Sequence, residues 1–475
     1  MKFEGKGCRT MRVISRCVLS VAVLLVRYMA CGAFEAKWES LDLRPVPLLW
    51  TDAKLGVFVH WGPYAVPAFA PTDAKSIYTC YSEWYHGRLI GTNAEFVAHH
   101  KAHYGNMPYG NFAAEFKAEN FDSKAWAELF RKSGAKYAVL TSKHHDGYAL
   151  WPSAVTPYYN SVSLGSGCDL VGEFTAAMKG AGLRCGFYYS LLEYANPKYP
   201  KRRNGTNCAA TLAMKEWARA VNLPQMKELV ENYEPDIIWP DGEWDWPAED
   251  HLSEEFLAWL YNDSKVGASV VVNDRWGVKC RGRHGGHYTT EYGNADEGVS
   301  MTGEYVHPWE ECRGIGNSFG YNRYETPDQY MSREKCIETL VSTVSRGGNL
   351  LLNVGPTADG IIPPIQQDRL LAIGRWLDVN GDAIYGTRAW EKRPKSMKKE
   401  RVYFTAKGDA VYAIVFGSPE KVLVPDIGAV GSVTLLGSER KVDWRQQDVI
   451  VEISMPEFRQ GAAPCEYALA FRVEK

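Results

Sequence analysis

The sequence predicts an α/β protein in which a (β/α)8-type (TIM-like) barrel is followed by a small antiparallel β-sandwich. Over most of the chain, short apolar runs alternate with helical patterns, which is typical of a parallel sheet with helical crossovers. Beyond about Trp390 the pattern changes to short strands divided by turn residues. A chain of 475 residues is also long enough for one large barrel and a smaller companion domain.

The barrel elements are predicted from these alternating patterns, in chain order. The first strand covers residues 55–62. Asp122 or Ser123 caps the first long helix, and Gly134 ends it. Further strands are predicted at residues 137–141, 184–189, 237–239, 269–273 and 348–353, and further helices at residues 170–178, 223–230, 254–261 and 364–377.

The C-terminal part reads as a separate unit. After a basic linker at residues 392–401, strands are predicted at residues 402–405, 410–416, 433–436, 449–453 and 467–473. This part contains no cluster of acids and histidines. The expected domains are therefore a catalytic barrel at residues 34–390 and a sandwich at residues 391–475.

Residues 1–33 have the pattern of a signal peptide. Basic residues precede the apolar run 18–26, and small residues follow it up to Ala33. The run is too short for a stop-transfer helix, so we expect cleavage near Ala33 and a mature chain that starts around Phe34. Two alternatives are left open, a lipid-anchored start at Cys31 and an uncleaved membrane anchor. A secreted, periplasmic or lysosomal protein without a membrane span after cleavage is expected.

Composition narrows the function classes. The chain has 54 basic and 56 acidic residues, so it offers no electrostatic basis for binding nucleic acid. Of its 11 cysteines, eight remain after the leader is removed, and an oxidising compartment permits disulfides whose pairing the sequence does not give. No CxxC pair is present, so structural zinc is not expected. Asn204 and Asn262 begin glycosylation sequons.

Polar side chains gather where the predicted strands end. A buried strand delivers Asp241, which is followed by Gly242 and by a second acid, Glu243, between tryptophans. Residues just past the carboxyl ends of parallel strands line the site in such folds. The positions expected to meet at this end of the barrel are His60, His144, His145, Asp146, Tyr188, Tyr189, Asp241, Asn273, Asp274, Arg275 and Trp276. Acids beside tryptophans suit a sugar, whose C–H faces stack on rings while its hydroxyls take hydrogen bonds.

Metal-dependent and serine-based chemistry fit this pattern less well. His144 and His145 are adjacent, and on an extended chain they point to opposite faces, so we do not expect both to bind one ion. No GxSxG nucleophile elbow is present. A metal-dependent barrel hydrolase is kept as an alternative.

Two carboxylates that act on a glycosidic bond fit better. In the retaining route one carboxylate attacks the anomeric carbon and a second, about 5–5.5 Å away, protonates the leaving oxygen. Asp241 is the expected nucleophile. Glu291, Glu304 and Glu310 all qualify by residue type as the acid/base.

Several rare sequence words occur together in one order. They lie at residues 54–62, 82–85, 137–147, 239–244, 272–277 and 347–360. On these words the chain resembles the α-L-fucosidases of glycoside hydrolase family 29, over essentially the whole mature length.

The resemblance implies a retaining exo-hydrolase that removes terminal α-L-fucose from glycans, with no metal and no other cofactor. It assigns Asp241 as the nucleophile. Glu291 is the preferred acid/base, held protonated by burial or a like charge, and Glu310 is the second choice. The residues implied to bind fucose are His60, Glu83, Trp84, His144, His145, Tyr188 and Arg275. Residues 70–81 differ from the family pattern as an insertion that reshapes the leaving-group side.

Other interpretations are kept beside this one. The chain is alternatively a catalytically inactive fucose-binding protein on the same scaffold, and the sugar is alternatively a neighbour such as galactose. The expected partner is a fucosylated glycan. A homo-oligomer is left open.

Overall fold

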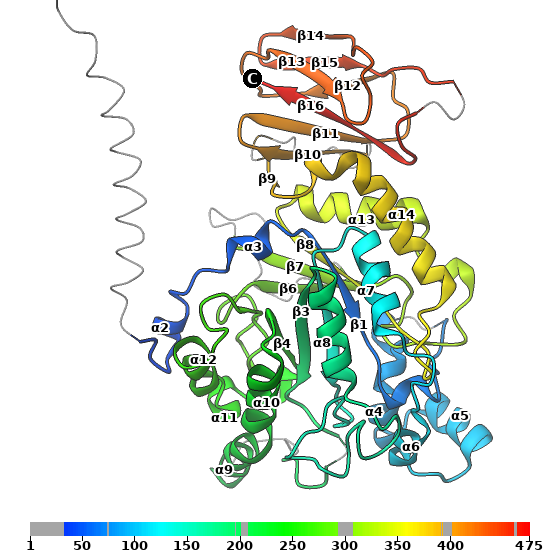
Figure 1. Ribbon diagram of the computed structural model, residues 1–475, viewed down its shortest axis with the longest axis vertical. Helices are drawn as coiled ribbons and strands as arrows, with labels where there is room; N and C mark the ends of the chain where they lie inside the picture. Colours follow the sequence, from blue (N-terminus) through cyan, green and yellow to red (C-terminus); the bar gives the residue numbers. More distant parts are fainter. Residues whose placement is uncertain are drawn as a thin grey trace, which may run out of the picture.

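The computed structural model describes residues 33–73, 76–194, 196–200, 208–292, 307–390, 392, 401–459 and 463–475. Outside these residues lie positions 1–32 of the predicted leader, most of the predicted linker, Asn204 and Glu304. The described chain forms a barrel part and a C-terminal part made of strands (Figure 1).

Eight parallel strands form the barrel. They lie in the order β5-β4-β3-β2-β1-β8-β7-β6. A parallel bridge between Asn273 and His287 links the two end strands and so closes the ring. The strands are β1 (Leu55–Val59), β2 (Tyr137–Lys143), β3 (Arg184–Ser190), β4 (Ile237–Asp241), β5 (Val271–Val272), β6 (Tyr288–Glu291), β7 (Trp309–Gly314) and β8 (Asn349–Val354).

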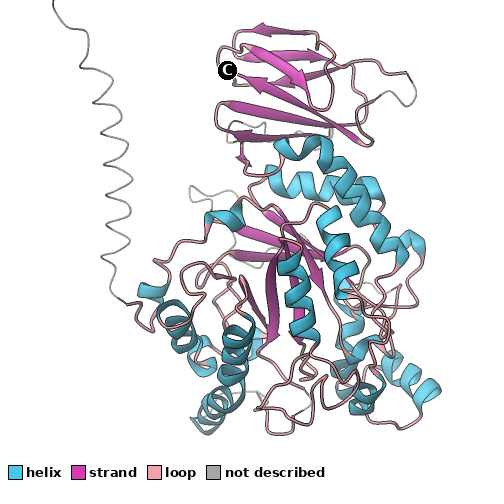
Figure 2. Ribbon diagram, in the orientation of Figure 1, coloured by secondary structure: helices cyan, strands magenta, loops and turns pink. Residues whose placement is uncertain are grey.

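The long helices surround these strands (Figure 2). Two of them begin where the sequence places caps, since the Asp122 side chain accepts from the amides of Lys124 and Ala125, and the Asp169 side chain accepts from that of Gly172. The long helices are α7 (Ser123–Lys132), α8 (Leu170–Gly180), α10 (Leu223–Tyr233), α12 (Ser253–Asn262), α13 (Arg333–Ser345) and α14 (Pro364–Asn380). The other helices are α2 (Trp38–Leu41), α3 (Leu48–Thr51), α4 (Tyr85–Ile90), α5 (Ala94–Tyr104), α6 (Phe112–Glu115), α9 (Cys208–Trp217) and α11 (Ala248–His251).

Two barrel strands, β6 and β7, had no strand signal in the sequence. Their sequences, Tyr-Thr-Thr-Glu and Trp-Glu-Glu-Cys-Arg-Gly, carry acids where the other strands carry apolar residues. The closed ring supplies partners for these acids, so tertiary context overrides the weak local pattern.

The C-terminal part is an antiparallel β-sandwich, as predicted. One sheet has the order β13-β16-β11-β10-β9 and the other β12-β15-β14. Between them lies an apolar core that includes Phe404, Val415, Val451 and Phe471. The strands are β9 (Arg388–Ala389), β10 (Val402–Lys407), β11 (Ala410–Phe416), β12 (Lys421–Val424), β13 (Ser432–Leu435), β14 (Trp444–Gln447), β15 (Ile450–Ser454) and β16 (Ala468–Glu474).

The sandwich packs against α13 and α14 of the barrel part (Figure 1). The indole of Trp376 on α14 donates a 2.9 Å hydrogen bond to the carbonyl of Ala468 on β16. Arg401 contacts Glu334 and Glu338 of α13 at 2.7 and 2.9 Å. The strand β9 lies just before the predicted boundary at residues 390/391, and that boundary remains a prediction.

The structure bears on three features that the sequence raised: the cysteines, the sequon at Asn262 and a membrane span. The seven described cysteines whose side chains are placed are all free thiols. The side chain of Asn262 both accepts a hydrogen bond from the backbone amide of Phe34 and donates one to its carbonyl, each at 2.8 Å. In the part of the chain that the structure describes, no helix is long and apolar enough to cross a membrane.

Candidate active site

The carboxyl ends of the barrel strands open into one cavity of about 300 Å³. Asp241 ends β4 and Glu291 ends β6, whereas His60 follows β1 and His144 follows β2. The cavity is lined by Phe58, His60, Tyr78, Tyr81, Glu83, Trp84, Arg88, His144, Tyr188, Trp239, Asp241, Trp244, Arg275, Arg281, Glu291, Cys312 and Phe319.

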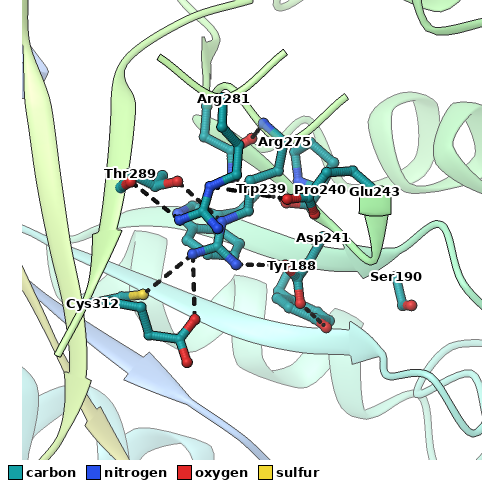
Figure 3. A network of polar contacts seen from close by, with 12 residues as sticks. Tyr188, Ser190, Trp239, Pro240, Asp241, Glu243, Arg275, Arg281, Thr289 and Cys312 are labelled. Carbon is teal, nitrogen blue, oxygen red and sulfur yellow. Dashed lines mark hydrogen bonds and ion pairs between the residues drawn. The ribbon is translucent and has the colours of Figure 1, made fainter. Parts of the chain in front are cut away.

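Asp241 is held by donors on both carboxylate oxygens (Figure 3). Arg275 Nη1 lies 2.6 Å from Oδ1, and the Tyr188 hydroxyl donates to Oδ2 at 2.8 Å. Burial alone would raise the pKa of Asp241, but the charge of Arg275 and these hydrogen bonds outweigh burial and bring the pKa below its ordinary value. Asp241 is therefore an anion near neutral pH.

Glu291 faces the same cavity and shares a partner with Asp241. The Tyr81 hydroxyl donates to its Oε1 at 2.6 Å, and Arg275 Nη2 lies 3.5 Å from its Oε2. The two terminal nitrogens of one guanidinium thus face the two carboxylates. Arg275 is itself fixed by a 3.0 Å hydrogen bond from Nε to Thr289 Oγ1.

Glu310 does not line the cavity. It is buried, with its carboxylate accepting from the Tyr137 hydroxyl at 2.6 Å and from Trp239 Nε1 at 2.9 Å. The pairing register explains the difference, because Glu310 on β7 stands opposite Thr289 while Glu291 stands opposite Cys312. Glu310 therefore lies two residues, about 7 Å, further toward the amino ends of the strands.

The predicted histidines meet at the site, all of them buried. Burial lowers the pKa of His60 to about 3 and that of His145 to about 4, and it lowers the pKa of His144 well below its ordinary range. All three are neutral near pH 7. His60 Nδ1 lies 2.7 Å from Asn353 Oδ1. Among the described residues, His144 Nδ1 has no hydrogen-bond partner.

The expectation that His144 and His145 point to opposite faces is wrong. Their ring centroids lie 4.1 Å apart, and His145 Nε2 lies 3.8 Å from Asp241 Oδ2. The strand β2 ends at Lys143, so the two histidines stand on the turn that follows and do not alternate as strand residues do. Within the described ranges, no group of three or more His, Cys, Asp or Glu side chains is arranged to hold a metal ion.

Glu83 and Trp84 stand on a short 3-10 helix, Ser82–Trp84, in the segment between β1 and β2. Glu83 Oε2 accepts from the Gly320 amide at 2.8 Å, and burial raises the pKa of Glu83 to about 7. The Trp84 ring stacks on that of Trp244, with centroids 5.7 Å apart.

Sequence reasoning missed the apolar wall of the cavity, which Phe58, Trp239 and Phe319 form. A signal for two of them exists, because Phe58 and Trp239 stand two residues before His60 and Asp241 on their strands. Residues two apart share a strand face. Phe319 and Tyr81 come from loops, where no such period applies.

A family model described as alpha-L-fucosidase matches residues 23–382, and one described as the alpha-L-fucosidase C-terminal domain matches residues 395–474. The chain belongs to the α-L-fucosidase family of glycoside hydrolases. The predicted family and the predicted enzyme class are therefore confirmed.

Individual α-L-fucosidases are similar over nearly the whole chain. Tissue alpha-L-fucosidase of Rattus norvegicus is 40% identical over 451 residues, which is 93% of each chain. The crystal structure of the Thermotoga maritima alpha-fucosidase in complex with fucose has a TM-score of 0.76 at 36% identity, covering 93% of this chain and 100% of that chain. A GH29 α-L-fucosidase from Bacteroides thetaiotaomicron, solved as a trapped covalent intermediate with 2-fluoro-fucosyl fluoride, has a TM-score of 0.72 at 25% identity, covering 90% and 95%. These neighbours confirm the barrel-plus-sandwich fold.

Proposed function

We propose that this α-L-fucosidase is a retaining exo-glycosidase that removes terminal α-L-fucose from fucosylated glycans by double displacement. The observation that carries the proposal is the position of Asp241 and Glu291 on one cavity, with Arg275 facing both. Retaining glycosidases use two such carboxyl groups on either side of the scissile bond.

In the first step an oxygen of Asp241 forms a bond to carbon 1 of fucose as the glycosidic C–O bond breaks. The proton of the Glu291 carboxyl group passes to the departing oxygen, so the glycan leaves as an alcohol. Asp241 suits the nucleophile's part because it is ionised, and its hydrogen bonds to Arg275 and Tyr188 fix its direction.

In the second step water enters on the side that the glycan has left. Glu291, now a carboxylate, takes a proton from that water while the oxygen bonds to carbon 1 and the ester bond to Asp241 breaks. Two inversions at carbon 1 restore the original configuration. The Bacteroides relative trapped as a covalent intermediate supports a mechanism of this kind.

The cavity wall supports a deoxy-sugar as the substrate. Phe58, Trp239 and Phe319 offer only ring surface to a methyl group, whereas the O6 hydroxyl of galactose would be left without a partner there. Neutral His60 and His144 suit hydrogen bonds with sugar hydroxyls. The Thermotoga relative in complex with fucose supports the same assignment.

The remaining expectations are part of this proposal. The leader-like residues 1–33 favour a secreted, periplasmic or lysosomal enzyme. A catalytically inactive fucose-binding protein is not favoured by any feature of the site, because both carboxylates are in place.

The test is hydrolysis of an aryl α-L-fucoside followed by proton NMR. We expect α-L-fucose to appear first and the β-anomer to grow in only by mutarotation. First release of β-L-fucose would contradict the retaining route, and no release of fucose by the correctly folded enzyme would contradict the hydrolase proposal.

A further inference from the structure

An aromatic surface continues from the cavity to solvent. Trp244 lines the cavity and is 40% exposed, and its ring stacks on Trp84 with an interplanar angle of 22°. The turn after Asp241 puts it there. Gly242 has φ +79°, and a Cβ at Gly242 would lie 2.7 Å from the Cβ of Leu192. Glycine is needed at this position, and the sharp turn it permits directs Trp244 to the mouth.

Tyr78 forms the other end of this surface. It also lines the cavity and is 47% exposed. Arg88 joins the two ends, because its Nη2 donates to the Tyr78 carbonyl at 2.7 Å and its guanidinium lies 5.4 Å from the Trp84 ring centroid. We call Tyr78, Arg88, Trp84 and Trp244 the rim.

The Tyr78 end of the rim lies on the side where the leaving group departs. The ring of Tyr78 contacts that of Tyr81 edge-on, with centroids 5.8 Å apart, and the Tyr81 hydroxyl donates to Glu291 at 2.6 Å. The leaving group, whose oxygen receives the proton of Glu291, therefore departs close to Tyr78, because only the Tyr81 ring stands between Tyr78 and Glu291. Tyr78 belongs to residues 70–81, the insertion that the sequence associates with this side.

We propose that Trp244 and Tyr78 form a binding subsite for the pyranose that carries the fucose. This inference rests on the proposed function and specifies which part of the substrate the rim recognises. Large aromatic rings held in place and exposed at the mouth of the cavity match the apolar C–H face of a sugar, and such stacking surfaces add binding energy at little entropic cost. The rim thus selects a glycan leaving group over one without a ring.

The experiment compares two substrates that share fucose. α-L-Fucosyl fluoride has a leaving group without a ring, whereas a fucosylated disaccharide carries a pyranose. For Trp244→Ala we expect the ratio of kcat/KM on the disaccharide to kcat/KM on the fluoride to fall about tenfold, and for Tyr78→Ala to fall several-fold. Trp244→Tyr keeps an aromatic ring and should retain most of the wild-type ratio. Tyr158→Ala is the matched control, because Tyr158 is 88% exposed and does not line the cavity.

Failure of the subsite proposal and failure of the proposed function give different results. An unchanged ratio in Trp244→Ala, whether both activities fall together or neither falls, overturns the subsite. If the wild-type enzyme turns over neither substrate, the proposed function fails, and that result is seen before any variant is made.

Discussion

The indole Nε1 of Trp239 donates a 2.9 Å hydrogen bond to Oε2 of Glu310. The same indole ring lies under Arg275, whose guanidinium carbon is 4.7 Å from the ring centroid. Arg275 in turn faces both Asp241 and Glu291. Glu310 is thus connected to the cavity through Trp239, which makes it a positioning residue by geometry.

Glu310→Gln should lower kcat/KM by up to about tenfold, because it weakens the hydrogen bond from Trp239, and a buried hydrogen bond is worth roughly 0.5–1.5 kcal/mol. Trp239→Phe removes the N–H but keeps an aromatic ring, and should have a similar effect. If Glu310 acts through Trp239, the double variant loses little more than either single variant. Additive losses would contradict this connection, and rescue of Glu310→Gln by azide would show that Glu310 is itself the acid/base.

Asp241→Gly should reduce turnover of an aryl fucoside by about 10⁴-fold or more, because no group remains to attack carbon 1. Azide should restore turnover by filling the space left by the side chain, and the product should be β-L-fucosyl azide after a single inversion. Activity close to that of the wild-type enzyme would refute the assignment of Asp241 as nucleophile.

Glu291→Ala should show a loss that depends on the leaving group. With an oligosaccharide the rate should fall by about 10²–10⁴-fold, because the departing oxygen is no longer protonated. α-L-Fucosyl fluoride, which needs little protonation, should lose far less. Azide should here give α-L-fucosyl azide, the opposite anomer to the Asp241 variant, and an equal loss on both substrates would exclude Glu291 as the acid/base.

We expect His251 to make the folded protein less stable at acidic pH. It is fully buried on α11, and among the described residues neither of its ring nitrogens has a hydrogen-bond partner. Burial lowers its pKa from 6.5 to about 3. Between these values the unfolded chain binds a proton that the folded chain does not, so stability is complete above pH 6.5 and falls as the pH decreases toward 3.

Replacing His251 should therefore make the free energy of unfolding depend less on pH. Between pH 7.5 and 5 the free energy of unfolding of His251→Leu should fall by about 2 kcal/mol less than that of the wild-type enzyme. Denaturant unfolding at the two pH values measures this difference, in which the other buried histidines cancel. An equal fall in both proteins would mean that His251 is protonated in the folded state or already neutral in the unfolded one.

Some elements of the fold could be predicted from the sequence and others could not. Six of the eight barrel strands can be predicted from apolar runs in the sequence, because strands buried on both faces carry apolar residues at nearly every position. The helix caps at Asp122 and Asp169 are local hydrogen bonds, and they occur where the sequence places them. The strands β6 and β7 cannot be predicted in this way, because they carry acids whose hydrogen-bond and ion-pair partners are distant in sequence.

The sequence by itself determined the family, six of the eight barrel strands, and the placement of Asp241 after a buried strand, since each depends on neighbours along the chain. The tertiary structure alone decided which glutamate joins Asp241. Glu291 and Glu310 lie on adjacent parallel strands, and only the register between β6 and β7 puts Glu291 in the cavity and Glu310 behind Trp239. Register is a relation between segments, and closure of the ring sets it.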